Sequence, residues 1–347
     1  MSSFFQVLSR TSTPLGFVRP LSSSTTAKTT KGPHNSSITS YCSDLVSSKN
    51  NLFIEVHTFQ RVFFCPLTAR RHDYEMFLCT LLIPDPILRT KVMTVRAFNT
   101  EVAIIRDQVS QKEIGLSRLV FWREAVNQLY LSKKADSSYK NVPRQPTVLG
   151  MSKVIFEHDV SKKWLVNLLD GRERLMSDVP FTDLSDLEAY CDQTVTSILF
   201  ITFEILGVKN VDVDHASSHL GKAIGLGTFA RSIPYNAQNR RVLVPRDMLI
   251  KHGLSQEDFI RNKQSEKIKE LVYEIASHAH IHYDKAKSMS KLIDKKALPL
   301  FLAGVPTDIY LKRLQRVQFD PYHPSLTTKY RLLPWHLYFR KIKGSYF

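Results

Sequence analysis

The stretch "RAFNTEVAIIRD" (residues 96–107) has the residue spacing of a metal-binding helix but not the side chains. Asn99 and Ala103 stand four residues apart, which places them on one face of a helix. Two carboxylates at this spacing would bind a divalent cation through hard oxygen ligands. An amide and a methyl group carry no charge. The face is therefore either a metal site that has lost its ligands or one that never held a metal.

Two pairs of histidines offer a second candidate site. His215 and His219 stand four residues apart, and so do His278 and His282. Such a pair on a helix binds zinc or iron when a carboxylate completes the ligand set. Neither pair has the glutamate of an HExxH motif, and His280 indicates a polar face. We interpret these histidines as structural or solvent-facing, and we expect no metal and no cofactor.

The composition favours a helical scaffold for these residues. Hydrophobic side chains make up 43% of the 347 residues, enough for a sizeable core, and there are only 12 glycines. Apolar residues recur at helical spacing over long stretches, whereas short alternating runs are few. We expect an all-α chain in which Trp122 packs in the core. The most apolar run, residues 195–207, is too short to span a membrane and contains Glu204, so it is predicted to be a buried helix.

The formal net charge of +16 implies attraction to an acidic partner. An anionic membrane surface, an acidic protein and nucleic acid all qualify. The Lys and Arg residues are spread over the chain without a basic block interleaved with aromatic residues, so we expect no nucleic-acid binding. Four cysteines, Cys42, Cys65, Cys79 and Cys191, show no CxxC spacing, which indicates a reducing compartment and no zinc site.

The N-terminal residues have the composition of an organellar targeting peptide. Arg10, Arg19, Lys28, Lys31 and Lys49 stand against a single acid in the first fifty residues, in a background of Ser and Thr. The apolar core of a secretory signal is missing. We predict a disordered transit peptide, mitochondrial or plastid in type, over residues 1–40. The alternative is a disordered basic tail that stays on the protein.

Residues 228–245 combine a helix end, a loop and a helix start. A helix is expected to end at Arg231, ahead of Pro234, and a polar loop should follow it. The segment "RRVLVP" (240–245) is short and extended, and Pro245 suits the first turn of the next helix.

Two segments of the chain resemble the motifs of a known family. "RAFNTEVA" (96–103) is similar to R-A-L-D-T-x-x-D. "TFARSIPYN" (228–236), with "RRVLVP" after it, is similar to N-x-x-R-D-x-x-x-D followed by G-R-x-Y-L-P. These are motifs of the squalene and phytoene synthase family. The similarity extends over residues 41–325, and it implies a single-domain isoprenoid (terpenoid) synthase helical bundle.

The resemblance also implies what the site has lost. Enzymes of this family ionise an allylic diphosphate, and Mg²⁺ ions held by carboxylates on two facing helices neutralise the leaving group. The four matching positions in this chain are Asn99, Ala103, Ser232 and Asn236. Every one of the carboxylates is missing, so the resemblance implies a pseudoenzyme with no catalytic residues and no bound metal.

Two acids near the first motif do not replace the missing carboxylates. Glu101 lies two residues from Asn99, so a helix turns it away from that face. Asp107 lies on the continuation of the face, two turns from Asn99, but it has no anionic partner in the second motif.

Within the family, the chain is most similar to non-enzymatic members. The leader, "FEILG", "DHASSHLGKA", "GLSQEDFIR" and "FDPYHPSL" resemble members that are needed to build respiratory complex I in mitochondria. This implies a peripheral protein on the matrix side of the inner membrane, with complex I subunits or assembly intermediates as partners. Residues 47–71 depart from the family. We expect them to be a poorly packed insertion or a gene-model artefact.

Two other functions stay open at this point. The first is an isoprenoid or lipid carrier, in which the vacated cavity is apolar and arginines hold a phosphate. Four arginines qualify as anion-binding residues: Arg96, Arg231, Arg240 and Arg241. Their alternative role is in salt bridges at helix ends and in loops. The second function is a residual prenyl-diphosphate synthase that uses other ligands.

The C-terminal segment, residues 326–347, mixes aromatic and basic side chains. Trp335, Tyr338 and Phe339 lie close to Arg340 and Lys341. Aromatic and basic residues together suit an anionic membrane interface. A packed terminal segment is the alternative.

Overall fold

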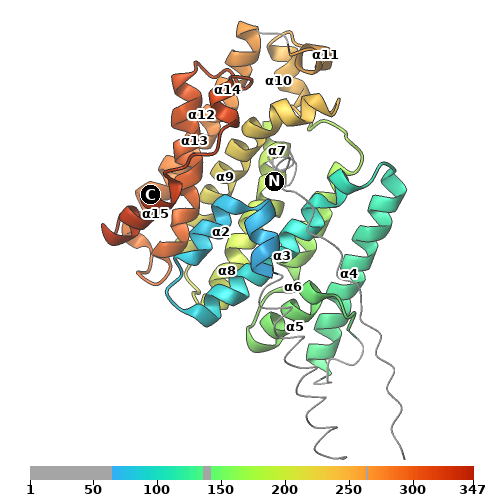
Figure 1. Ribbon diagram of the computed structural model, residues 1–347, viewed down its shortest axis with the longest axis vertical. Helices are drawn as coiled ribbons and strands as arrows, with labels where there is room; N and C mark the ends of the chain where they lie inside the picture. Colours follow the sequence, from blue (N-terminus) through green and yellow to red (C-terminus); the bar gives the residue numbers. More distant parts are fainter. Residues whose placement is uncertain (1–64, 136–141, 263–264) are drawn as a thin grey trace, which may run out of the picture.

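The computed structural model describes residues 65–135, 142–262 and 265–347 (Figure 1). Regular structure in these ranges is helical, without a strand, so the all-α prediction is confirmed. The predicted transit peptide at 1–40, Cys42 and residues 47–64 lie outside the described residues. The predicted domain limits at 41–325 and 326–347 stay predictions.

The described residues form a series of helices. Their order is α2 (Tyr74–Leu81), α3 (Pro86–Gln108), α4 (Lys112–Lys134), α5 (Pro146–Glu157), α6 (Lys162–Leu175), α7 (Leu184–Cys191), a π-helical segment (Asp192–Thr196), α8 (Ser197–Leu206), α9 (Val211–Gln238), α10 (Arg246–Lys251), α11 (Gln256–Ile260), α12 (Glu266–Ser288), two 3₁₀ segments (Met289–Leu292 and Leu298–Gly304), α13 (Val305–Arg316), α14 (Pro324–Thr327) and α15 (Leu333–Ile342).

Helices α3 and α9 carry the two motif segments and organise the bundle. α9 runs through the middle of the molecule and packs along α12 (Figure 1). It also contacts α7, α13 and the π-helical segment. α3 packs against α2, α4, α5, α6 and α8.

Local sequence fixes where α3 begins. Asp85 accepts hydrogen bonds from the backbone N–H groups of Ile87 at 2.7 Å and Leu88 at 3.2 Å. Pro86 occupies the first helical position, where a missing N–H is tolerated. The cap and the proline therefore fix where α3 begins. Within α3, Asn99 lies on a buried face.

Helix α9 does not end where the sequence predicts. It continues past Arg231 and contains Pro234 in its interior, so the predicted helix end and polar loop are wrong. A proline removes one helical hydrogen bond and costs about 3 kcal/mol. Burial of Ile233 and Ala237 in the core offsets this cost. As a result, Asn236 lies on the same helix as Ser232, one turn further on.

Two glycines of α9 allow it to approach the preceding chain closely. A Cβ on Gly221 would lie 2.8 Å from the Cα of Thr196, and a Cβ on Gly225 would lie 2.5 Å from the Cβ of Cys191. Real side chains do not tolerate these distances. Residues of the size of glycine are thus required where α9 crosses α7 and the π-helical segment.

The expectation for residues 47–71 is wrong for the described part. Residues 65–72 are helical, and Cys65 and Ala69 are buried. These two side chains stand four residues apart, so one face of the helical segment packs against the core. The expectation of poor packing remains a prediction only for the earlier part of the range.

Two expectations about the core are confirmed. Trp122 is buried and lies edge-on to Phe98, with ring centroids 5.4 Å apart. The apolar run at 195–207 forms most of α8, whose side chains are largely buried. Among the described helices, none is both long and apolar enough to cross a membrane.

Replacing Gly221 by valine should destabilise the protein. The new Cβ meets backbone at Thr196, so α9 or the π-helical segment has to move. Overpacking of this kind costs about 1–3 kcal/mol. Thermal unfolding should show a lower melting temperature for Gly221→Val.

Gly207→Ala is a control for backbone strain without a steric clash. Nothing lies within 4 Å of its Cβ position, and only its positive φ is disfavoured. Equal melting of wild type and Gly221→Val would contradict the close approach.

Candidate functional site

A cleft between α3, α6, α7 and α9 is lined by three of the four motif positions. Ala103 on α3 and Ser232 and Asn236 on α9 line the cleft. Asn99 is buried behind its wall, with 1% of its surface exposed. Three of the four positions that the motifs pair therefore share one cavity. The fourth is joined to that cavity through an arginine.

That arginine is Arg172 of α6, which the sequence analysis did not identify. Its Nη2 donates to Oδ1 of Asn99 at 3.1 Å, and its Nη1 donates to the hydroxyl of Tyr190 at 2.6 Å. Arg172 is 6% exposed and lines the cleft. A protein guanidinium thus stands beside the first position of the motif.

The sequence did contain a signal for Arg172. Leu165, Leu168, Leu169 and Arg172 follow one another at the spacing of a buried helical stripe, and all four are buried. A charged residue in such a stripe needs a partner inside the fold, because buried charges are costly when unpaired.

The metal-ligand positions of the second motif carry neutral side chains that hydrogen-bond within α9. Asn236 donates from Nδ2 to Oγ of Ser232 at 3.1 Å, and Ser232 donates to the carbonyl of Phe229 at 2.8 Å. These bonds stay within α9 and leave no negative charge facing α3.

Two carboxylates do lie in the cleft, but each is paired with an arginine. Asp107 and Arg241 form a salt bridge at 3.0 Å, which links α3 to the chain after α9. Asp178 and Arg106 form a second, bidentate pair. Both acids of the cleft are thus in contact with a cation of the chain.

The residues of this cleft do not fit the Mg²⁺ ions that the family resemblance implies. Mg²⁺ binds through carboxylates and phosphates, and the four motif positions supply two amides, a hydroxyl and a methyl group. The guanidinium of Arg172 already uses Oδ1 of Asn99. A cation would therefore meet positive charge where the family places its ligands.

Glu101 faces away from the cleft, as its spacing predicts. It accepts a hydrogen bond from Nε2 of Gln145 at 2.6 Å and another from the hydroxyl of Thr147. Burial raises the pKa of Glu101, and these two hydrogen bonds oppose the rise. The residue ties α3 to the start of α5.

Arg96 and Arg231 contact acids of the chain itself. Arg96 is buried, donates from Nε to the hydroxyl of Thr80 at 2.8 Å and lies 3.5 Å from Asp73. Nη1 of Arg231 lies 2.9 Å from each carboxylate oxygen of Glu75. Burial acts to lower the pKa of Arg231, but the charge and hydrogen bonds of Glu75 outweigh it and hold the pKa above its ordinary value.

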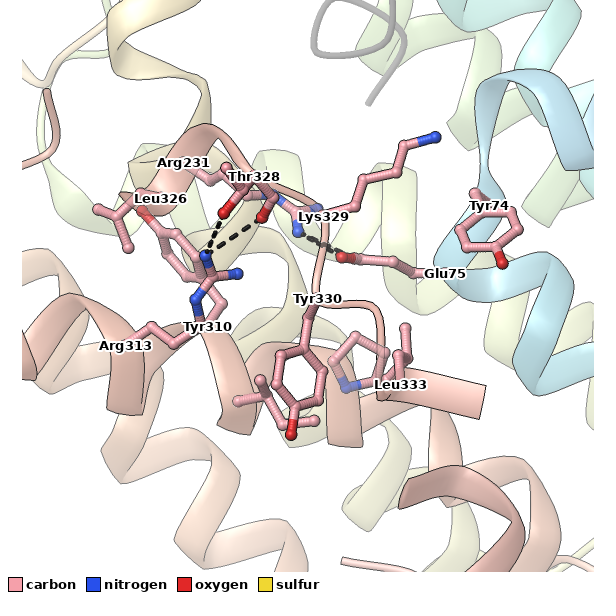
Figure 2. A pocket seen from close by; sticks show the side chains of 12 residues that line it. Tyr74, Glu75, Arg231, Tyr310, Arg313, Leu326, Thr328, Lys329, Tyr330 and Leu333 are labelled. Carbon is pink, nitrogen blue, oxygen red and sulfur yellow. Dashed lines mark hydrogen bonds and ion pairs between the residues drawn. The ribbon is translucent and has the colours of Figure 1, made fainter. Parts of the chain in front are cut away.

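The Arg231–Glu75 pair borders a second pocket. Figure 2 shows Glu75 reaching from α2 toward Arg231, with Tyr310 and Arg313 on the opposite side. The hydroxyl of Tyr310 is buried and has no hydrogen-bond partner among the described residues. Glu75, a carboxylate of the chain itself, therefore pairs with Arg231, which would otherwise be available to an external anion.

The contacts of three arginines match their alternative role in salt bridges. Arg96, Arg231 and Arg241 each have an acid of the chain within 3.5 Å. Arg240 lies at the exposed turn after α9 with a positive φ of 56°. Arg96 and Arg231 lie near the same acid, Asp73, whereas Arg241 pairs with Asp107.

Three histidines form a hydrogen-bonded chain between helices. Nε2 of His215 lies 3.2 Å from Nε2 of His219, and Nδ1 of His219 lies 2.8 Å from Nδ1 of His282. Nε2 of His282 lies 3.1 Å from Glu188 on α7. Because His219 uses its two ring nitrogens on opposite sides, the three rings do not converge on one point. The geometry supports their structural interpretation.

The described cysteines are buried thiols. Burial raises the pKa of Cys65 to about 11 and that of Cys79 to about 12, and it raises the pKa of Cys191 as well. All three are free, and their protonated form makes them poor nucleophiles and poor metal ligands.

Comparison with known proteins gives one family and one fold. The family model described as squalene/phytoene synthase matches residues 69–338. A Homo sapiens protein named NADH dehydrogenase (ubiquinone) complex I, assembly factor 6 is 41% identical over 283 residues, which cover 82% of each chain. A Drosophila melanogaster homolog of that factor is 33% identical over 284 residues, covering 81% of this chain and 84% of its own.

A solved structure supports the same fold. The squalene synthase HpnC from Alicyclobacillus acidocaldarius superposes with a TM-score of 0.65 at 17% sequence identity. The match covers 76% of this chain and 95% of that one. The predicted isoprenoid synthase helical bundle is therefore confirmed.

Replacing Glu75 by glutamine should destabilise the protein and expose Arg231 to external anions. Removing one partner of a largely buried ion pair leaves the other charge unpaired, with a cost of about 1–3 kcal/mol. The melting temperature of Glu75→Gln should fall and should be partly restored by inorganic pyrophosphate. Glu257→Gln is the control, because its pair with Arg261 is exposed. A Glu75→Gln variant that melts like wild type would contradict the role of the pair.

Protonation of His219 should destabilise the fold in acid. Burial, followed by the neighbouring His282 and His215, lowers the pKa of His219 from 6.5. The folded state therefore favours the neutral ring, and its stabilising effect is present above pH 6.5 and lost as the pH falls through the lowered pKa. His219→Gln should show a smaller drop in melting temperature on acidification than wild type. The exposed His280→Gln should keep the wild-type slope.

Proposed function

This chain belongs to the squalene/phytoene synthase family, and from this membership we propose that it is a non-enzymatic assembly factor for mitochondrial respiratory complex I, NADH:ubiquinone oxidoreductase. The names of its relatives in animals support the proposal. The observation that carries it is the cleft. All four positions that match the metal ligands of the family are neutral, while the fold around them is kept.

The internal contacts explain why such a protein is a scaffold in this proposal and not a prenyl-transferring enzyme. Ionising a diphosphate requires cations that stabilise the leaving group as charge develops. Here Arg172 hydrogen-bonds to Asn99 and Tyr190, and Arg231 is paired with Glu75. These two arginines therefore already have acceptors within the chain.

The proposed location is the matrix side of the mitochondrial inner membrane, with peripheral attachment. The net charge of +16 suits an anionic surface or an acidic partner. The proposed partners are complex I subunits or assembly intermediates, as the names of the relatives imply.

A second candidate function is the binding or transfer of an isoprenoid or another lipid. The cleft has Leu175, Phe181 and Val195 among its lining residues. Nε of Arg172 is buried at its wall without a hydrogen-bond partner among the described residues. Mass spectrometry of the purified protein decides this candidate, since a carrier retains a lipid and a scaffold with an empty cleft does not.

Cells that lack their own assembly factor of this family test the proposal. Expression of this chain should restore complex I, measured as assembled complex on native gels and as NADH oxidation. Purified protein incubated with farnesyl diphosphate and Mg²⁺ should release no diphosphate. Unchanged complex I deficiency in cells that import the chain would overturn the assembly role. Mg²⁺-dependent release of diphosphate would instead support the residual synthase.

A further inference from the structure

Helix α15 has two apolar faces, and only one of them packs against the protein. Leu333 and Leu337 are buried and join a cluster with Cys79, Leu302 and Val305. At 100° per residue, these two leucines point to one side of the helix. The opposite side of the helix faces away from this cluster.

The outward side of α15 is an exposed apolar stripe. Trp335, Tyr338, Phe339 and Ile342 follow one another at positions i, i+3, i+4 and i+7, so they share one face. Their exposed fractions are 61%, 50%, 53% and 63%. The aromatic rings also contact one another, with Trp335 and Phe339 stacked at 6.4 Å. Figure 1 shows α15 at the outer edge of the molecule.

The helix is held in place at several points. Nζ of Lys341 donates to the carbonyl of Leu82 at 2.9 Å, and Arg340 pairs with Asp308 at 3.4 Å. After α15 the chain returns to the core, where Phe347 is buried against Phe301 with ring centroids 5.2 Å apart. The stripe is therefore presented by a fixed helix and not by a loose end.

The C-terminal segment that carries the stripe is basic, and Asp308 of α13 is an acid paired with one of its arginines, Arg340. Residues 321–347 contain five Lys and Arg and no Asp or Glu. Arg331 and Lys343 flank the two ends of α15 and are exposed. A protein partner would need a matching apolar surface rimmed by acids. A bilayer with anionic lipids supplies both features over any area, and aromatic side chains with basic neighbours suit its interface.

We infer that the outward face of α15 docks on a bilayer containing anionic phospholipid, with Trp335, Tyr338, Phe339 and Ile342 entering the interface. Arg331 and Lys343 then lie at the level of the phosphate groups. The inference deepens the proposed function and rests on it for the identity of the membrane, the matrix face of the inner membrane. It does not depend on the cleft, which lies between α3, α6, α7 and α9.

Vesicle sedimentation with the full chain tests this docking. Wild type should bind vesicles of phosphatidylcholine mixed with phosphatidylglycerol, bind phosphatidylcholine alone far less, and dissociate as salt is raised. Trp335→Ser/Ile342→Ser should lower binding to the mixed vesicles by about tenfold or more. The control is Val120→Ser/Leu131→Ser on α4, whose side chains are 64% and 66% exposed. It should bind like wild type.

Tryptophan fluorescence reports the same event at one residue. Of the three tryptophans, Trp122 is buried and Trp335 is the most exposed. Mixed vesicles should shift the emission of wild type to shorter wavelength. Trp335→Phe should keep vesicle binding but lose the shift. Thermal unfolding of each variant in solution controls for loss of fold.

Three results would overturn the inference. They are equal binding by wild type and Trp335→Ser/Ile342→Ser, equal loss in the α4 control, and a wild-type dimer that the α15 substitutions convert to a monomer without any vesicle binding. The last result would make the face an interface between two copies. Failure to restore complex I by a wild type that binds vesicles would instead overturn the proposed function and leave the docking surface intact.

Discussion

Arginine side chains that the fold withdraws from water must find acceptors inside it, because an unpaired charge in the interior costs several kcal/mol. Arg96 of α3 is matched by Asp73 and Thr80, Arg231 of α9 by Glu75, and Arg172 of α6 by Asn99 and Tyr190. These contacts connect α2 to α3, α2 to α9, and α6 to both α3 and α7. The helices that surround the two motif segments are therefore joined by internal charge pairing and hydrogen bonds.

The same constraint explains how the fold and the chemistry of this family can separate. The helical bundle depends on apolar stripes and on close crossings such as that of α9 at Gly221 and Gly225, and none of these requires a metal ion. Once neutral residues stand at the ligand positions, the positive groups nearby need other partners. In this chain Glu75 supplies a carboxylate and Asn99 an amide oxygen. The positive groups around the two motif segments therefore have hydrogen-bond acceptors from within the chain.

Much of this arrangement could be predicted from local sequence, and the rest depends on contacts between distant residues. Helical periodicity predicts the all-α fold, the burial of Trp122 and the orientation of Glu101, because each follows from spacing along one helix. The pairing of Arg231 with Glu75 joins residues 156 positions apart, and no local pattern encodes it. Pro234 leads to a wrong helix end because the free-energy cost of a proline inside a helix is offset here by burial of Ile233 and Ala237. Arg172 is an intermediate case. Its place in a buried helical stripe predicts that it has a hydrogen-bond partner inside the fold, but not which residue that partner is.

The central claim is that the cleft, with neutral side chains at the four motif positions and the guanidinium of Arg172 beside Asn99, has no site for divalent metal and diphosphate. Titration of the purified protein with Mn²⁺ in the presence of inorganic pyrophosphate, followed by electron paramagnetic resonance, measures this directly. Our account predicts that the Mn²⁺ signal remains that of the ion and its pyrophosphate complex in free solution. Stoichiometric, pyrophosphate-dependent binding of Mn²⁺ that is lost in Asn99→Ala/Asn236→Ala would contradict it.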